Sequence, residues 1–100
     1  MFIYQGKTAL ITGASSGIGQ AFAHALAARH MNVVLVARSE ERLRTLATEL
    51  SQQHQVHTEV IVSDLSQERA ALSLQREAER RGLVIDLLIN NAGFAANGFF

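Results

Sequence analysis

The sequence has no cysteine, no proline and no tryptophan in 100 residues, and its nine basic residues balance nine acidic ones. Without cysteine there are no disulfides and no thiolate chemistry, which favours a reducing, cytoplasmic location. Without net charge there is no basic field to attract nucleic acid or an anionic membrane surface. No apolar run approaches the ~18 residues that a membrane-spanning helix needs. We therefore expect a globular protein with neither a nucleic-acid nor a membrane partner.

The sequence also lacks a pattern typical of metal ligands. Its four histidines are scattered, and only His54 and His57 are close together. These two are predicted to lie at the end of a helix and the start of a strand, where no coordination geometry follows from their spacing. We therefore expect no metal site.

What the sequence does have is a regular alternation of short apolar runs with segments of helical periodicity. The apolar runs, predicted as strands, cover residues 7–12, 32–37, 56–62 and 86–89. Short strands joined by helical crossovers form a parallel sheet, and right-handed crossovers place helices on both of its faces. The sequence thus predicts a one-domain α/β fold, a Rossmann-like doubly wound parallel sheet with strand order 3-2-1-4.

The predicted helices have recognisable start and stop signals. The first begins near Gly17, Ser39 is expected to cap the second, and Asp64 or Ser66 is expected to cap the third, which Gly82 ends. The residues expected to face the sheet are Ile18, Ala21, Phe22, Ala25 and Leu26 in the first helix, Leu43, Leu46, Ala47 and Leu50 in the second, and Ala71, Leu74 and Ala78 in the third.

The stretch TGASSGIG, residues 12–19, occupies the turn between the first strand and the first helix. Gly13 would allow the tight turn, while Gly17 and Gly19 would let a pyrophosphate approach the backbone N–H groups of the helix and let the helix pack on the strand. The spacing G-x-x-x-G-x-G differs from the general dinucleotide fingerprint G-x-G-x-x-G. A purely structural glycine turn is the alternative.

A second polar stretch, NNAG at residues 90–93, follows the fourth strand. In the order 3-2-1-4 this strand lies beside the first, so both loops open on one crevice at the carboxyl edge of the sheet. Asn and Gly are also ordinary turn residues, which is the alternative for this stretch taken alone.

Together these stretches resemble the short-chain dehydrogenase/reductase family. TGASSGIG matches the family's T-G-x-x-x-G-x-G cofactor loop, NNAG matches its second motif, and SDL at residues 63–65 also matches. The resemblance covers essentially the whole chain. It implies an NAD(P)-dependent oxidoreductase that interconverts alcohols and carbonyls by hydride transfer, with a nicotinamide dinucleotide and a small carbonyl or alcohol compound as its partners.

The resemblance also implies roles for individual residues. Asp64 would accept a hydrogen bond from the adenine amine with the Leu65 backbone beside it, although Asp64 could instead be a helix cap. Asn90, Ala92 and Gly93 would line the ribose on the nicotinamide side. The residues that would hold the phosphates and the adjacent ribose are Gly13, Ser15, Ser16, Gly17, Ile18 and Gly19.

The residue after the second strand bears on the choice of cofactor. NAD-specific members of the family carry an acidic residue at the end of this strand, whereas this sequence has Ala37 followed by Arg38. A guanidinium can bind a 2′-phosphate through two hydrogen bonds, and a carboxylate would repel it. We therefore expect NADP(H) to be preferred over NAD(H). The alternative is an exposed Arg38 loosely paired with Glu40 or Glu41.

The family's catalytic residues have no counterparts in this sequence. The family uses a tyrosine with a lysine four residues later, together with a serine and an asparagine. The sequence has one tyrosine, Tyr4, and one lysine, Lys7, which are three residues apart and precede the first strand. We assign no catalytic residue and expect residues 1–100 to be the N-terminal NAD(P)-binding Rossmann portion of a longer single-domain enzyme, inactive on their own.

Two further expectations concern function and assembly. A non-catalytic dinucleotide-binding sensor or interaction module would keep the same crevice without the chemistry, and it remains the alternative function. The apolar run at residues 83–89 carries only Asp86 as a charge. Exposed strands of this kind recruit partners. Either the remainder of a longer enzyme covers this strand or the chain associates with itself, and we expect a homo-oligomer.

Overall fold

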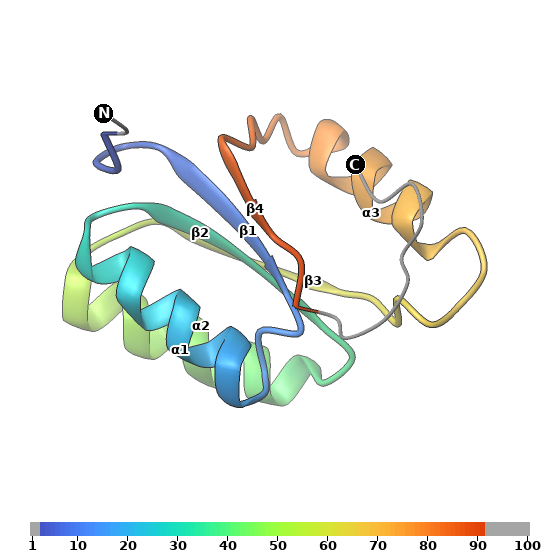
Figure 1. Cartoon of the computed structure of the whole chain (residues 1–100), viewed down its shortest axis with the longest axis horizontal. Helices are drawn as coiled ribbons and strands as arrows, with labels where there is room; N and C mark the ends of the chain where they lie inside the picture. The colour runs from blue at the N-terminus through green and yellow to red at the C-terminus, as the bar shows by residue number, and fades with distance from the viewer. Residues whose placement is uncertain (1–2, 92–100) are drawn as a thin grey trace.

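The computed structural model describes residues 3–91. The elements follow one another as β1 (Thr8–Thr12), α1 (Gly17–Ala28), β2 (Asn32–Ala37), α2 (Glu40–His54), β3 (Thr58–Val62), α3 (Ala70–Arg80) and β4 (Leu87–Ile89). The four strands form one parallel sheet in the order β3-β2-β1-β4. The predicted fold class and strand order are confirmed (Figure 1).

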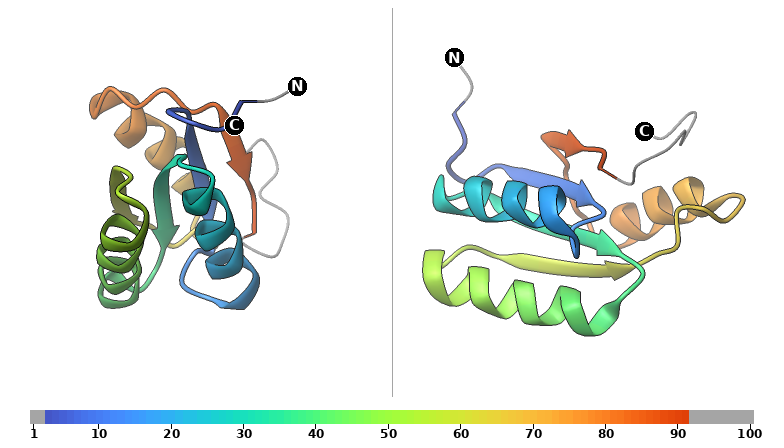
Figure 2. Two further views of the ribbon diagram at one scale, coloured as in Figure 1. Left: turned by 90° about the vertical axis from the view of Figure 1, so that its left-hand side faces the viewer. Right: turned by 60° about the horizontal axis from the view of Figure 1, so that its bottom comes forward.

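The sheet separates two apolar layers because successive side chains of a strand point to opposite faces. Ala9, Ile11, Val33 and Leu35 face α1 and α2, whereas Leu10, Val34 and Val36 face Leu74 of α3. Figures 1 and 2 show α1 and α2 running side by side, with α3 across the sheet from them. Helices therefore lie on both faces, as predicted for a doubly wound sheet.

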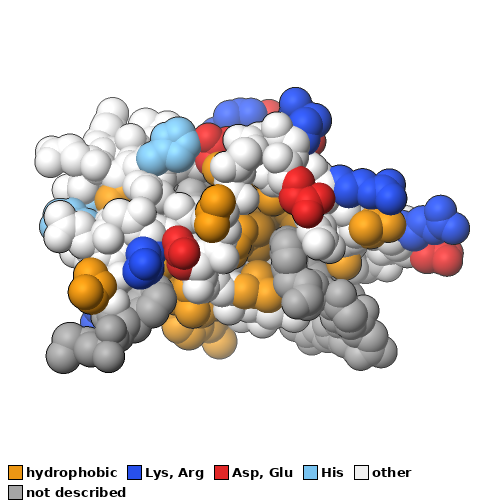
Figure 3. All heavy atoms as spheres, turned by 90° about the horizontal axis from the view of Figure 1, so that it is seen from above, with side chains coloured by type: hydrophobic (Ala, Val, Ile, Leu, Met, Phe, Trp, Pro, Cys, Tyr) orange, Lys and Arg blue, Asp and Glu red, His pale blue; other side chains and the backbone are white. Residues whose placement is uncertain are grey.

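The face that carries α3 is less completely covered than the other. Leu83, Ile85 and Leu88 are only partly buried there, and Val84 is 74% exposed. In Figure 3, which looks onto the molecule from above the view of Figure 1, apolar side chains gather near the middle of the surface. No helix within residues 3–91 is long and apolar enough to cross a membrane.

The second helix matches its prediction closely. Ser39 Oγ accepts a hydrogen bond from Arg42 N at 3.4 Å, so Ser39 caps α2 as expected. The buried residues of α2 are the predicted Leu43, Leu46, Ala47 and Leu50.

The predicted end of the third helix is also observed. Gly82 follows α3 with a φ of +72°, a left-handed conformation that suits a glycine ending a helix.

The predicted inward stripe of α1 is wrong except at Leu26. Ile18 is 67% exposed and Phe22 is 41% exposed, and Ala21 and Ala25 are exposed as well. The helix is alanine-rich, so small residues occur on more than one face, and the face that packs on the sheet is the one that allows the closest approach. Its buried residues are Gly19, Ala23, Leu26 and Ala27.

The predicted start of the third helix is also wrong. Neither Asp64 nor Ser66 caps it, because α3 begins at Ala70 after Arg69, whose backbone is left-handed at φ +68°. Asp64 instead accepts hydrogen bonds from Ser66 N at 3.0 Å and from Ser66 Oγ at 2.6 Å. This local turn uses the carboxylate before the helix starts. As a result Ala70 is buried and Ala71 only half-buried.

Candidate functional site

A cavity of about 700 Å³ lies at the carboxyl ends of β1, β2 and β3, where loops from the three strands meet. Six of the residues singled out from the sequence line it, namely Gly13, Ser15, Ser16, Arg38, Asp64 and Leu65. Gly17, Ile18, Gly19 and Asn90 are not part of its lining, and Ala92 and Gly93 lie outside the described residues. In parallel sheets this edge, next to the first strand, is the usual place for a ligand.

The glycines of the loop after β1 serve different purposes. Gly13 has a φ of +63°, and a Cβ there would lie 2.6 Å from Asn91 O. A Cβ on Gly19 would lie 2.2 Å from Gly13 O, so the close packing of α1 on the loop requires glycine. A Cβ on Gly17 would meet nothing within 4 Å. Packing therefore explains Gly13 and Gly19 but gives no reason for a glycine at position 17.

The N-terminus of α1 leaves its backbone donors available. Ser16 occupies the N-cap position but makes no side-chain cap, and the first turn has no acidic residue. Ser16 Oγ instead donates to Gly13 O at 3.2 Å. The first N–H groups of a helix have no partners within the helix and carry a partial positive charge. The start of α1 therefore fits a bound anion.

Thr12 joins the loop after β1 to the residues after β4. Its side chain is fully buried, and its Oγ1 accepts a hydrogen bond from Asn91 N at 2.8 Å and donates to Asn90 Oδ1 at 3.1 Å. Asn91 Nδ2 also reaches Gly13 O at 3.5 Å. The predicted meeting of the two loops at one crevice is thus observed. The second loop contributes Asn91, rather than the predicted Asn90, to the cavity lining.

The charges around the cavity are unevenly paired. Ser66 hydrogen bonds lower the pKa of Asp64, and the positive charge of Arg38 lowers it further. Glu40 binds Arg44 at 2.9 Å. Arg38 is exposed, as the alternative expected, but within residues 3–91 it pairs with neither Glu40 nor Glu41. Within residues 3–91 neither the Arg38 nor the Arg42 side chain has a hydrogen bond or ion pair. Both guanidinium groups belong to residues that line the cavity.

Ser39, Arg42 and Asn91 are cavity residues that the sequence reasoning did not select as site residues. Arg42 could have been found from the sequence. It lies three residues after the Ser39 cap, which places it in the first turn of α2, at the same sheet edge as Arg38. Asn91 adjoins the selected Asn90, and only the register of the turn after β4 decides between them.

Tyr4 and Lys7 lie away from this cavity. Both precede β1, whereas the cavity is at the carboxyl ends of the strands. The Tyr4 ring lies under Arg29, 5.5 Å from the guanidinium carbon to the ring centre, and Lys7 N donates to Tyr4 O at 3.1 Å. Tyr4 and Lys7 therefore lie at the opposite edge of the sheet from the cavity.

Comparison with known proteins finds extensive matches. The very-long-chain 3-oxoacyl-CoA reductase of Anas platyrhynchos is 43% identical over 90 residues, which are 90% of this chain and 28% of that protein. The inactive hydroxysteroid dehydrogenase-like protein 1 of Homo sapiens is 38% identical over 88 residues, which are 88% of this chain and 26% of that protein. The chain therefore spans about a quarter of the length of these relatives.

Solved structures and a family model agree with these matches. L-sorbose reductase from Gluconobacter frateurii, complexed with NADPH and L-sorbose, superposes with a TM-score of 0.84 and 34% identity, covering 94% of this chain and 36% of that one. The family model described as short chain dehydrogenase matches residues 7–100. With that match added to the parallel sheet and the glycine loop, the chain belongs to the short-chain dehydrogenase family of oxidoreductases.

Proposed function

We propose that this chain is the NADP(H)-binding part of a short-chain oxidoreductase that reduces a carbonyl compound or oxidises the corresponding alcohol. The observation that carries the proposal is the uncapped N-terminus of α1, beside Gly17 and next to a cavity lined by Arg38 and Arg42. Bare backbone donors with no Cβ at Gly17 suit a diphosphate. The nicotinamide, when bound, supplies or accepts the hydride.

Each part of the cavity would hold one part of the cofactor. Backbone N–H groups of Ser15, Gly17, Ile18 and Gly19 would bind the diphosphate, with the Ser15 and Ser16 hydroxyls beside it. Ser16 N is not among these donors, because it already donates to Gly13 O at 3.3 Å. Asp64 and Leu65 line the cavity where the adenine would lie. Asp64 Oδ1 accepts two hydrogen bonds from Ser66, whereas Oδ2 accepts only a long one from Gln67 Nε2 at 3.4 Å. Asp64 Oδ2 would therefore be the acceptor for the adenine amine, with its second lone pair. These residues bind and orient the cofactor and transfer no proton.

The preference for NADP(H) rests on Arg38. Its guanidinium has no hydrogen bond or ion pair within residues 3–91, although it belongs to a residue that lines the cavity. The nearby Asp64 carboxylate interacts with Arg38 through its charge but makes no hydrogen bond to it. A 2′-phosphate would supply an anion that forms charge-assisted hydrogen bonds with the guanidinium. The sorbose reductase that superposes on this chain was solved with NADPH, which agrees with this preference.

Fluorescence titration of NADPH and NADH tests the cofactor preference. We expect NADPH to bind more tightly, and we expect Arg38→Ala to weaken NADPH binding about tenfold to a hundredfold while leaving NADH affinity nearly unchanged. Arg44→Ala is the matched control, because Arg44 is paired with Glu40 and does not line this cavity. Equal or tighter binding of NADH by the unmodified chain would reject the preference.

The catalytic residues belong, in this proposal, to a longer protein of which residues 1–100 are the N-terminal part. The chain matches about a quarter of the length of its relatives, and neither Tyr4 nor Lys7 lies near the cavity. We expect no carbonyl reduction by these 100 residues alone. Measurable turnover by the purified chain would contradict this part of the proposal. The same proposal includes a cytoplasmic location and a homo-oligomeric assembly. Light scattering tests the assembly, because it measures the molar mass of the protein in solution.

A non-catalytic dinucleotide-binding protein is the second candidate function. It is favoured by the human relative that is named as inactive and is 38% identical to this chain. The protein's remaining sequence separates the two candidates. A tyrosine followed four residues later by a lysine, with a serine upstream, supports the enzyme, and their absence supports the non-catalytic protein.

A further inference from the structure

The outer edge of β3 is one of the two ends of the sheet, since within residues 3–91 β3 pairs only with β2. In the β2–β3 ladder Val33 N donates to His57 O and Ser63 N donates to Ala37 O. Odd-numbered residues of β3 therefore direct their backbone groups toward β2. Because these directions alternate along a strand, Thr58, Val60 and Val62 direct theirs outward. Such a row of unpaired donors and acceptors is a template for another strand.

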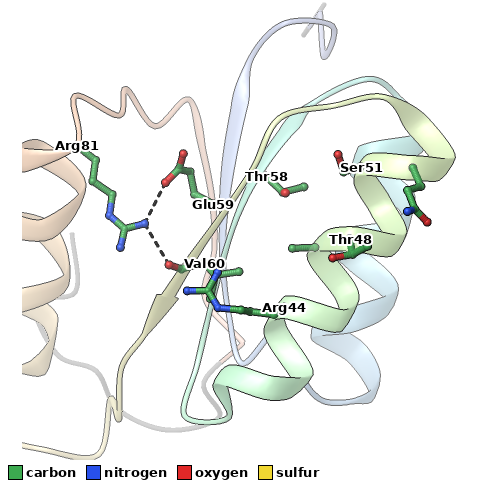
Figure 4. Close-up of a pocket in the computed structure, with 9 residues that line it drawn as sticks. Arg44, Thr48, Ser51, Thr58, Glu59, Val60 and Arg81 are labelled. Atoms are coloured by element: carbon green, nitrogen blue, oxygen red, sulfur yellow. Dashed lines mark hydrogen bonds and ion pairs between the residues drawn. The ribbon is translucent and has the colours of Figure 1, made fainter.

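Arg81 covers the middle of this edge. From the end of α3 its Nη1 reaches across to Val60 O at 3.1 Å and to Glu59 Oε1 at 3.0 Å (Figure 4). Its Nε binds Glu77 Oε2 at 2.7 Å, so the guanidinium is held from α3 and from β3 at once. One side chain thus occupies the central outward carbonyl of the strand.

The carboxylates that hold Arg81 stay charged over a wide pH range. Hydrogen bonds from Arg80 and Arg81 lower the pKa of Glu77 to about 2. Burial would raise the pKa of Glu59, but hydrogen bonds from His57 and Arg81 outweigh it and lower the pKa. Since both values lie below normal, these contacts are fully present above the ordinary glutamate range and are lost only as the pH falls through the lowered values.

On the other side of this edge α2 lies beside β3 but leaves an open groove between them. A groove of about 490 Å³ runs between α2 and β3, lined by Thr48, Ser51 and Gln52 of α2 and by Thr58 and Val60 of β3. In Figure 4 Thr48 and Ser51 stand across this groove from β3, whereas Arg81 approaches from the opposite side. Arg44 lines this groove as well, but among residues 3–91 only the Arg81 side chain hydrogen-bonds an outward backbone group of β3.

The edge is complementary to itself. If two β3 strands met antiparallel about a twofold axis through Val60, each Val60 would face its counterpart and Thr58 would face Val62, all with outward backbone groups. Glu59 would then lie opposite Ile61, and the two Glu59 side chains would be diagonal neighbours about 7–8 Å apart, so like charges would not be directly opposite each other. An interface that brings the same surface together from both copies is the commonest form of dimer contact.

We propose that Arg81 prevents the β3 edge from pairing with β3 of a second copy of this chain. The proposal is independent of cofactor binding, because Arg81 lies outside the cavity lined by Arg38. Its loss would expose Val60 O and open the whole edge.

Sedimentation velocity on the full chain tests the proposal. Arg81→Met keeps the aliphatic stem and removes every donor, and we expect it to self-associate at concentrations about tenfold lower than the unmodified chain does. Arg80→Met is the matched control, because Arg80 also binds Glu77 but has no contact with β3. We expect Arg80→Met to associate as the unmodified chain does.

Fluorescence anisotropy with a labelled peptide of residues 57–63, HTEVIVS, shows whether β3 is the surface involved. Arg81→Met should bind this peptide, and it should not bind a version N-methylated at Val60 and Ile61, which cannot pair along either edge. If Arg81→Met loses its far-UV circular dichroism, Arg81→Lys replaces it, since one ammonium cannot span all three acceptors. Unchanged self-association, or equal binding of the two peptides, by a folded variant would overturn the proposal.

Discussion

Helices α1 and α2 begin at the same edge of the sheet, each directly after a strand, yet their N-termini differ. Ser39 caps α2 by accepting from Arg42 N, and Glu40 and Glu41 lie in its first turn. Ser16 occupies the same position before α1 but makes no cap, and its first turn has no acid. The chain thus neutralises one helix terminus with its own side chains and leaves the other without a side-chain cap or an acidic residue, as the proposed diphosphate site requires.

The largest expected effect on stability comes from the packing of α1 against the loop after β1. We expect Gly19→Ala to lower the free energy of unfolding by about 3 kcal/mol, because its Cβ would lie 2.2 Å from Gly13 O. Gly17→Ala should leave stability unchanged or raise it by up to about 1 kcal/mol, because a Cβ there meets nothing. Urea denaturation measures both. Equal losses from the two substitutions would show that the loop does not pack as described.

The next largest effect is expected from placing an acidic residue in the first turn of α1, as α2 has in its own first turn. Gly17→Glu places a carboxylate in the first turn, and we expect it to weaken NADPH binding about a hundredfold or more without lowering the free energy of unfolding. Gly17→Gln has nearly the same shape and no charge, so the difference between the two affinities isolates the charge. Cofactor fluorescence measures both. Unchanged affinity in folded Gly17→Glu would mean that the diphosphate does not bind at this terminus.

A smaller effect compares the two serines. We expect Ser39→Ala to destabilise the protein by about 1 kcal/mol, the usual cost of losing a cap. Ser16→Ala should cost less than about 0.5 kcal/mol, because Ser16 donates to Gly13 O at the surface and caps nothing. Denaturation without added nucleotide provides the measurement. A larger loss from Ser16→Ala than from Ser39→Ala would reverse the comparison.

The smallest effect concerns the charge in the first turn of α2. Glu41→Gln should cost roughly 0.3–1 kcal/mol at low salt and almost nothing at high salt, since salt screens interactions with the helix dipole. Glu79→Gln, in the last turn of α3, should slightly stabilise the protein for the same reason. Thermal denaturation at two salt concentrations would detect both changes. A salt-independent loss would point to a contact other than the dipole.

The fold was predictable wherever a residue pattern was compatible with only one arrangement of strands or one buried helix face. The alternation of strands with right-handed helical crossovers predicted the sheet order, and the leucine stripe of α2 predicted how that helix packs. The face of α1 was not predictable, because alanine fits either side of it and only the close approach at Gly19 selects one. The start of α3 was missed because hydrogen bonds local to Asp64 and Ser66 took the place of the expected cap.

The candidate site was predictable as far as strand ends determine it. Gly13, Ser15, Ser16, Arg38, Asp64 and Leu65 all follow strands and all line the cavity. Ser39, Arg42 and Asn91 line it as well, but their contributions depend on how the first turn of α2 and the turn after β4 are oriented. Apolar periodicity carries no information about those orientations.

The buried Thr12 hydroxyl has a consequence for how this edge of the molecule behaves. It binds the backbone of Asn91 and the side chain of Asn90, which lie almost eighty positions away along the chain. A one-residue slip of β4 against β1 would break both bonds and shift the Asn91 side chain away from Gly13 O. The Thr12 hydroxyl therefore couples the register of β4 against β1 to the conformation of the glycine loop. The contact of the Asn91 side chain with Gly13 O forms only when the two strands are in the observed register.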